Sequence, residues 1–287
     1  MLSFAEQRFT ADTVPILTQE VEDFWSLYDR GLDVHEVQAA LLQGIIKGDP
    51  LRRGTAPEFV AFVREHKDFY ENIRAASLES VRDLAPVREA IRGLVRRFPK
   101  ARLTPIRLAI GRMRTGGTVY GEEAFVAVEM FSRTASNPTA GLADLAPSRL
   151  HGPEYLPAAV VHELVHQQQS QRTDFPLYET CLREGAADFI AELVTGRNLG
   201  AVAREWAEPR RDDLFRRFRR DTQGGGSGGW LYGDPAPGQP RDLGYWIGSD
   251  ICARYWRTTK GKQNDVREIA QMRRPKRILS KALGWKQ

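Results

Sequence analysis

Apolar side chains recur every three or four positions through the first hundred residues, which is the period of an amphipathic helix. The stretch PILTQEVEDFWSLYDRG predicts one helix, which Gly31 can end. The stretch TAPEFVAFVREHKDFYENIRAAS opens with the capping-box pair Thr55 and Glu58 and predicts a second helix, with His66 as a core histidine on its apolar face. LAPVREAIRGLVRRF continues the pattern, so residues 1–100 are predicted to form a mainly helical N-terminal part.

After this part the spacing changes from helical to alternating. TPIRLAIGRMRTGGTVYGEEAFVAVEMFS predicts two strands, residues 105–113 and 124–132, joined by a Gly-Gly turn at 116–117. A stretch rich in Pro, Gly and Asn follows at 136–157 and predicts a loop. A few strands between helical segments predict an α+β fold that is mainly helical with a small mixed or antiparallel sheet.

Three further helices are predicted in the second half of the chain. Two lie at about 156–172 and 178–196, and RRDDLFRRFRRD forms a charged helix with a narrow apolar stripe of Leu214 and Phe218. The stretch TQGGGSGG, residues 222–229, has the composition of a flexible segment. Because the sequence after it is aromatic and typical of buried chain, we predict that these glycines form a surface loop within one domain.

The composition is that of a globular protein with a core, since 41% of residues are hydrophobic and 28% are charged. No apolar run is long enough to span a bilayer. The N-terminus has neither the features of a signal peptide nor a lipobox-like cysteine, and this predicts a cytoplasmic protein. Cys181 and Cys252 are too few for a disulfide framework and are predicted to be buried thiols.

The net charge of +5 is unevenly distributed along the chain. Residues 251–287 contain 11 Lys and Arg against 2 Asp and Glu, a net of +9, so the rest of the chain carries −4. A basic segment of this kind favours contact with nucleic acid or an anionic membrane, with Trp256 and Trp285 as stacking groups. The alternative is a solvated helical face.

The stretch VHELVHQQQ holds two of the chain's five histidines, His162 and His166. Residues four apart lie on one face of a helix, so both imidazoles can bind one tetrahedral Zn²⁺. Glu163 lies at the edge of that face and can reach a water on the metal without binding the metal itself. The glutamines at 167–169 are predicted to extend the helix, as exposed residues or, alternatively, as residues that line the cleft. Chance alone gives HExxH in roughly one chain in a hundred of this length, so a third ligand is needed.

A third ligand can come from a following helix. The metzincin pattern would need glycine at 169 and histidine at 172, but the chain has Gln169 and Arg172. Glu184 follows the second histidine by 18 residues, which allows a turn and a return helix. Glu192 is the competing carboxylate two turns further on. Asp188 shares the face of Glu184 and is predicted to accept a hydrogen bond from the free N–H of a ligand histidine.

Three protein ligands leave one zinc position open for water, which is the arrangement of a catalytic site. Zinc lowers the pKa of that water toward about 7, and Glu163 is predicted to take its proton and pass it to the leaving amine. Tyr245 is the predicted donor to the developing oxyanion, with Tyr232 and Tyr255 as alternatives. The strand 125–131 is predicted either to pair with the bound peptide or to be an ordinary core strand.

Taken in order, the stretches VHELVHQQQ, EGAADFIAEL and DLGYWIG resemble the predicted zinc-dependent proteases related to the gliding-motility protein GldB. FWSLYDRG and the paired-strand block are similar to that family too, so the resemblance runs from about residue 14 to the C-terminus. It implies a gluzincin-type metallopeptidase domain with His162, His166 and Glu184 as Zn²⁺ ligands and Glu163 as the base, acting on a peptide or protein. The glycine-rich loop and the basic C-terminus depart from the family pattern.

We therefore predict one zincin-like domain over residues 1–287, with the sheet and the metal-bearing helices in 101–200 and a helical, basic part in 230–287. The predicted function is zinc-dependent hydrolysis of peptide bonds. One alternative is a non-catalytic binding protein with a zincin fold. The other is a peptidase-like protein that its basic C-terminus targets to nucleic acid or to an anionic membrane.

Overall fold

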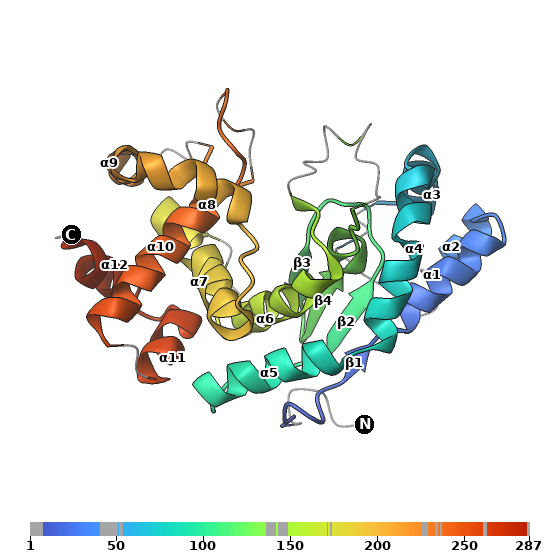
Figure 1. Cartoon of the computed structure of the whole chain (residues 1–287), viewed down its shortest axis with the longest axis horizontal. Helices are drawn as coiled ribbons and strands as arrows, with labels where there is room; N and C mark the ends of the chain where they lie inside the picture. Colours follow the sequence, from blue (N-terminus) through green and yellow to red (C-terminus); the bar gives the residue numbers. More distant parts are fainter. Residues whose placement is uncertain are drawn as a thin grey trace. The chain divides into compact units, whose positions relative to one another are not determined.

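A small mixed sheet and a larger set of helices make up the structure, a computed structural model shown in Figure 1, and they confirm the predicted α+β class. The structure describes residues 8–40, 51, 54–135, 142, 149–170, 172, 174–224, 229–232, 235, 237–260 and 263–285. Contacts divide the chain into two compact units, of which the first holds residues 1–91 and 103–163 and the second holds 92–102 and 164–287. The single domain that the sequence predicts stays a prediction.

The helices follow one another along most of the described chain. The α-helices are α1 (Gln19–Asp29), α2 (Val34–Ala40), α3 (Ala56–Glu65), α4 (Lys67–Arg82), α5 (Ala85–Arg97), α6 (Leu156–His166), α7 (Leu177–Thr195), α8 (Ala201–Ala207), α9 (Arg211–Gly224), α10 (Leu243–Thr258), α11 (Gln263–Gln271) and α12 (Pro275–Leu283). The 3-10 helices are η3 (Val128–Phe131), η6 (Pro153–Tyr155) and η7 (Glu208–Arg210). In the described part of the chain, no helix is long and apolar enough to cross a membrane.

The N-terminal helices confirm the predicted capping box and correct one boundary. The Thr55 side chain accepts the backbone N–H of Glu58, and the Glu58 carboxylate accepts the backbone N–H of Thr55 at 2.6 Å. The single helix predicted beyond this cap is two, because the backbone of His66 leaves the helical region between α3 and α4. His66 lies half-buried at this junction, edge-on to Phe62, so its predicted core position was wrong.

The described sheet contains β1 (Ile16–Leu17), β2 (Ile106–Ala109), β3 (Gly117–Tyr120) and β4 (Glu123–Ala127), in the order β1-β2-β4-β3. β1 pairs with β2 in parallel, and β2 pairs with β4 in parallel. β3 and β4 form an antiparallel pair. The sheet is therefore mixed, and β3 lies at its edge.

The two predicted strands and their Gly-Gly turn were wrong in detail. Gly117 begins strand β3, and the turn into β4 lies at Gly121, where φ is +59° and favours glycine. β4 has β2 on one side and β3 on the other, so residues 125–131 cannot offer an edge to a bound peptide. From Val128 the chain leaves the sheet as η3.

Glu129 explains why the second predicted strand stops early. Its side chain is 0% exposed, and its carboxylate accepts the backbone N–H of Gly111 at 2.8 Å and of Met113 at 3.1 Å. A buried carboxylate has to be matched by donors, and the turn after β2 supplies them. The carboxylate therefore holds a turn in which Met113 has a positive φ of 54°.

The two helices that carry the motif residues differ in how well the sequence predicts them. α7 agrees closely with the predicted 178–196, and its C-terminus is set by Gly196, which adopts the left-handed conformation with φ of 72°. α6 begins as predicted but ends at His166, six residues early. In the preceding predicted loop, residues 136–141 and 143–148 lie outside the described residues.

In the second unit, α7 and α10 pack against each other at glycines (Figure 1). A Cβ on Gly185 would overlap the backbone of Gly248, and a Cβ on Gly248 would overlap the carbonyl group of Cys181. A Cβ on Gly244 would lie 2.9 Å from the sulfur of Cys181. The glycines of EGAAD and DLGYWIG therefore allow the two helix backbones to touch.

The predictions for α9 and for the two cysteines agree with the structure, and the start of the predicted glycine-rich loop does not. Leu214 and Phe218 form the buried stripe of α9. Cys181 and Cys252 are free and buried, and burial raises the pKa of both thiols, which keeps them protonated and unreactive. α9 continues to Gly224, so residues 222–224 of the predicted glycine-rich loop are helical and that boundary was wrong; residues 225–228 lie outside the described part.

Candidate metal centre

Helix α6 fixes its two histidines by burying the apolar residues around them. Val160, Val161, Leu164 and Val165 are all 0% exposed, so the helix cannot rotate about its axis without exposing them. His162 is itself buried, on the same helix face as the second histidine one turn later. The rings therefore project from a rigid, anchored surface.

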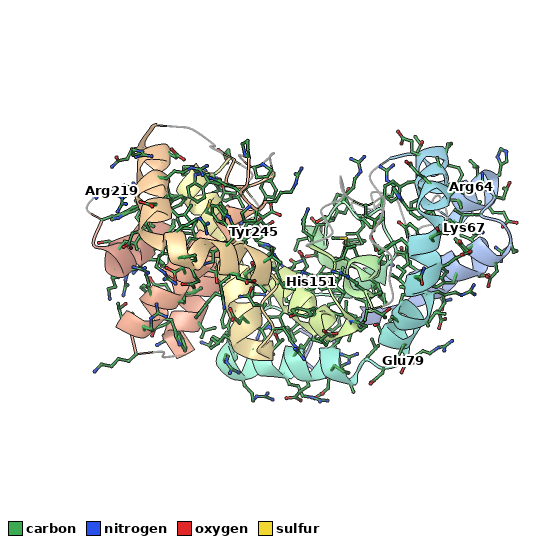
Figure 2. The ribbon with its side chains drawn as sticks, turned by 45° about the horizontal axis from the view of Figure 1, so that its top comes forward. Arg64, Lys67, Glu79, His151, Arg219 and Tyr245 are labelled. Carbon is green, nitrogen blue, oxygen red and sulfur yellow. The ribbon has the colours of Figure 1, made fainter. Side chains whose placement is uncertain are left out.

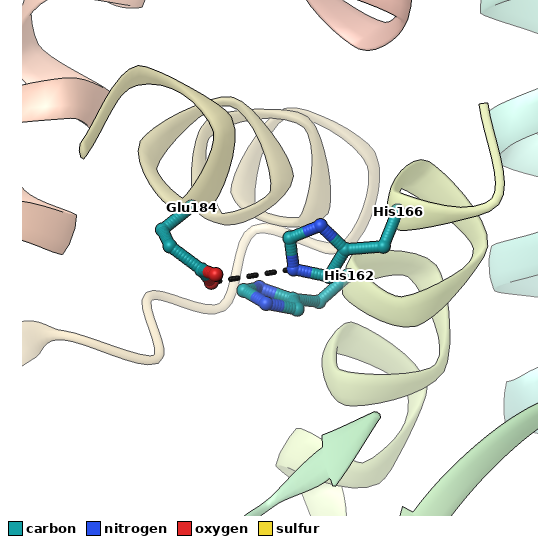
Figure 3. A group of neighbouring side chains, drawn as sticks. All are labelled: His162, His166 and Glu184. Carbon is teal, nitrogen blue, oxygen red and sulfur yellow. Dashed lines mark ion pairs between the residues drawn. The ribbon is translucent and has the colours of Figure 1, made fainter. Parts of the chain in front are cut away.

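His162, His166 and Glu184 form a group that could hold a metal ion (Figure 3). One nitrogen of each histidine and one carboxylate oxygen lie within 4.8 Å of one another. Nε2 of His166 is 3.3 Å from Oε2 of Glu184. The structure thus brings together the three residues that the sequence predicts as metal ligands.

One of these distances has the size expected for two ligands of a zinc ion. Two ligand atoms that each lie about 2.0–2.1 Å from zinc at a tetrahedral angle are about 3.3–3.4 Å apart. A direct charge-assisted hydrogen bond between an imidazole and a carboxylate is shorter, about 2.7–2.9 Å. The 3.3 Å separation of Nε2 of His166 and Oε2 of Glu184 is close to that expected for two ligands of one zinc ion, and all three ligand atoms lie within 4.8 Å of one another.

Gln169 orients the ring of His166. Its side-chain Nε2 donates to the carbonyl of Arg183 at 3.1 Å, which assigns the other amide atom as Oε1. Oε1 lies 2.9 Å from Nδ1 of His166 and can only accept, so Nδ1 carries the proton. Nε2 of His166 is then the unprotonated nitrogen, which is the form that binds a metal.

The glutamines after the motif were predicted to be exposed and helical, and this was wrong. Because α6 ends at His166, Gln167 to Gln169 lie in the following turn. Gln167 and Gln169 are 7% and 5% exposed. Gln168 bonds both backbone groups of Arg102, at 2.8 Å and 2.7 Å. The turn is therefore fixed by side-chain hydrogen bonds, one of which ends on a motif histidine.

Two tyrosines surround Glu184. The hydroxyl of Tyr232 donates to Oε1 of Glu184 at 2.5 Å. Desolvation of this hydroxyl, reinforced by the charge of Glu184 and opposed by a hydrogen bond from Tyr245, raises the pKa of Tyr232. Burial and the same carboxylate raise the pKa of Tyr245, which is labelled in Figure 2, well above its usual value. Both phenols stay protonated at neutral pH and can act as donors.

Glu163, the predicted base, lies against β3. It is buried, at 5% exposed. A Cβ on Gly117 would lie 2.5 Å from Oε1 of Glu163 and 2.7 Å from the carbonyl oxygen of Phe125. Only glycine leaves room for the carboxylate at the start of this strand, so the sheet and the predicted base are fitted to each other.

The competing carboxylate, Glu192, is engaged elsewhere. It forms a two-point ion pair with Arg204, at 2.7 Å and 2.5 Å, and it accepts a hydrogen bond from Asn198 at 2.9 Å. Burial opposes its ionisation, but Arg204 outweighs this and holds the pKa of Glu192 below its usual value. Among the two predicted carboxylates, the geometry therefore favours Glu184.

Tyr255 and Asp188 are the remaining residues that the sequence predicts near the site. The hydroxyl of Tyr255 donates to Glu268 at 2.6 Å, so this tyrosine is occupied within α10 and α11. Asp188 lies one turn beyond Glu184 on α7, half-buried. Its hydrogen bond to a ligand histidine stays a prediction.

Comparison with known proteins supports the metal centre. Residues 142–274 match the family described as Predicted Zn-dependent protease (DUF2268). This segment includes α6 and α7, which carry the three candidate ligands, and α10, but none of the sheet. No curated protein and no solved structure matches the chain. Over the matched segment, the chain is therefore similar to predicted zinc-dependent proteases.

Proposed function

We propose that the chain is a zinc-dependent peptidase of the gluzincin type. In this proposal His162, His166 and Glu184 bind the metal and Glu163 is the general base. The observation that carries it is the ligand group itself, in which two imidazole nitrogens and one carboxylate oxygen converge within 4.8 Å. The match of the same segment to predicted zinc-dependent proteases supports the choice of metal and of reaction. We also propose that the chain is related to the GldB-related proteases and that its fold is zincin-like.

Bound zinc would supply a Lewis acid and a water of lowered pKa. Glu163 follows the first ligand by one residue, so its carboxylate lies at the edge of the ligand face. There it accepts a proton from the attacking water and delivers it to the amine as the C–N bond breaks. Burial of Glu163 beside Gly117 keeps bulk water from competing for that proton.

The strand that fits a bound peptide is β3 and not 125–131. β3 is the last strand of the sheet order, and among described residues its one partner is β4. An extended peptide can add to such an edge through backbone hydrogen bonds. Because Gly117 begins β3 and adjoins Glu163, a peptide on this edge runs past the base.

Tyr245 remains the proposed donor to the oxyanion of the reaction. Its raised pKa keeps the hydroxyl protonated, as this role requires. Tyr232 also lies beside Glu184, but its hydroxyl already donates to that carboxylate. Tyr245 in turn hydrogen-bonds to the hydroxyl of Tyr232, so the proposed role requires Tyr245 to exchange this partner for the oxyanion of the substrate.

Three variants test the proposal. We expect Glu163→Gln to retain one zinc per chain and to lose peptide hydrolysis by about 10²–10⁴-fold, since the base alone is removed. His162→Ala should lose both the zinc and the activity. His35→Ala, which removes an exposed histidine on α2, is the matched control and should keep both. Zinc is measured by elemental analysis and activity with a peptide library; wild-type protein that binds no stoichiometric zinc contradicts the proposal.

A further inference from the structure

Tyr232 contacts the third ligand from a part of the chain 48 residues away. Its hydroxyl donates to Oε1 of Glu184 at 2.5 Å. The other oxygen, Oε2, faces Nε2 of His166 at 3.3 Å. The two oxygens of one carboxylate are thus divided between a tyrosine and the metal-binding group.

The backbone beside Tyr232 is anchored. Trp230, two residues before, is 0% exposed, and its indole N–H donates to Asp221 of α9 at 2.9 Å. Its ring packs edge-on against Phe218 at 5.1 Å between centroids. Its carbonyl accepts the N–H of Gly244 at 2.8 Å. The segment that carries Tyr232 is therefore tied to both α9 and α10.

The backbone of Tyr232 adopts a strained conformation, and burial of its ring does not offset the strain. Its φ is +58°, in the left-handed region that side chains with a Cβ disfavour. The residue is 70% exposed, so burial of the ring does not offset this strain. In this conformation the Tyr232 hydroxyl donates a hydrogen bond to Glu184 and also has a hydrogen bond with Tyr245. Strain of this kind gathers at functional sites.

We propose that Tyr232 is a positioning residue of the metal centre, which holds Oε1 so that Glu184 offers the metal a single oxygen, Oε2. This rests on the proposed function, since it assigns Glu184 to the metal. A carboxylate that binds through one oxygen leaves a coordination position for water. A carboxylate that is released can turn and fill that position with its second oxygen.

The test replaces the hydroxyl and keeps the ring. In Tyr232→Phe we expect the affinity for zinc, measured by competition with a chromophoric chelator, to fall by about 10- to 100-fold, the range for lost hydrogen bonds to metal ligands. We also expect the visible absorption of the Co²⁺-substituted protein to change shape and weaken, because that spectrum reports ligand number and geometry. A purely structural role for Tyr232 would leave the spectrum of the folded protein unchanged.

Tyr28→Phe is the matched control. It removes another tyrosine–glutamate hydrogen bond, to Oε1 of Glu71 at 3.2 Å, from the first unit. We expect this variant to keep the zinc affinity and the Co²⁺ spectrum of the wild type. If Tyr232→Phe matches the wild type in both, the positioning role is overturned while the peptidase proposal stands. If the wild-type protein binds neither metal, both proposals are overturned.

Discussion

At the scale of single residues, the candidate metal centre is held by hydrogen bonds to the side chains of two proposed ligands, His166 and Glu184. Oε1 of Gln169 accepts a hydrogen bond from Nδ1–H of His166, and the Tyr232 hydroxyl donates to Oε1 of Glu184. Each contact orients the side chain of a proposed ligand. The geometry of the ligand group therefore depends on Gln169 and Tyr232 as well as on the three proposed ligands.

Removing the carboxamide of Gln169 should weaken the centre. In Gln169→Ala, Nδ1 of His166 loses its acceptor, the ring can turn or change tautomer, and the zinc affinity should fall by about 10- to 100-fold. Gln168→Ala is the control, because Gln168 bonds the backbone of Arg102 and no histidine. Chelator competition measures both variants, and equal zinc affinities would refute the orienting role of Gln169.

A methyl group at Gly117 should disable the base and spare the metal. In Gly117→Ala the new Cβ meets Oε1 of Glu163 and the carbonyl oxygen of Phe125, and only the glutamate can move. We expect a lower kcat with full zinc content. Gly224→Ala adds the same methyl group where no atom lies within 4 Å, and should keep the wild-type kcat. An unchanged kcat in Gly117→Ala would show that catalysis does not need the space that Gly117 leaves for Glu163.

The sequence predicts the three proposed ligands better than it predicts the residues that hydrogen-bond to them. His162, His166 and Glu184 are set by spacing on two helices, and helical spacing is local. Gln169 was missed because the helix was expected to continue, whereas α6 ends at His166 and the turn buries the glutamine. Three glutamines after His166 carry no local signal for this stop, since hydrogen bonds to distant parts of the chain set it.

At the scale of elements, the contact of α7 with α10 sets the position of Glu184. Gly185, the next residue, touches the backbone of Gly248, so the two helices approach without intervening side chains. Glu184 of α7 and Tyr245 of α10 are thus on neighbouring helices, and the charge of Glu184 contributes to the raised pKa of Tyr245. The glycines of the two motifs therefore act on the ligand through helix packing.

Gly248→Ala should destabilise the second unit. The added Cβ would overlap the carbonyl of Cys181, which is backbone and cannot rotate away. We expect a loss of roughly 1–3 kcal/mol or more of unfolding free energy, as for overpacked cores, and a lower Tm in thermal unfolding. Gly224→Ala again serves as the control and should not lower Tm. A Gly248→Ala protein as stable as this control would show that the helices do not touch here.

The sheet shows where local patterns stop being informative. The alternation around 105–132 correctly indicates strands, but it cannot tell a turn from a third strand at Gly117. The parallel pairing of β1, β2 and β4 joins residues from Ile16 to Ala127, and no local pattern encodes such distant partners. After β4, the Glu129 carboxylate accepts the backbone N–H groups of Gly111 and Met113. These residues are 18 and 16 positions away, so the local sequence does not reveal the contact.

At the scale of the whole molecule, the chemistry and the family match fall in the same segment. Residues 142–274 include all three candidate ligands, while the sheet lies before them. The basic C-terminal part is partly neutralised within the structure, since Arg254 pairs with Asp250 at 2.8 Å and Arg277 with Glu268 at 3.5 Å. Contact with nucleic acid or an anionic membrane stays a prediction. Helix α9 also carries several arginines, of which Arg219 is labelled in Figure 2.

The most direct test of the metal centre is a crystal structure of the wild-type protein grown with zinc, with anomalous data collected at the zinc edge. The proposed centre predicts one strong peak about 2.0–2.2 Å from a nitrogen of His162, a nitrogen of His166 and Oε2 of Glu184. Such a peak would also show whether Oε1 stays with Tyr232. No peak at these three residues, or a peak at Glu192 in place of Glu184, would contradict it.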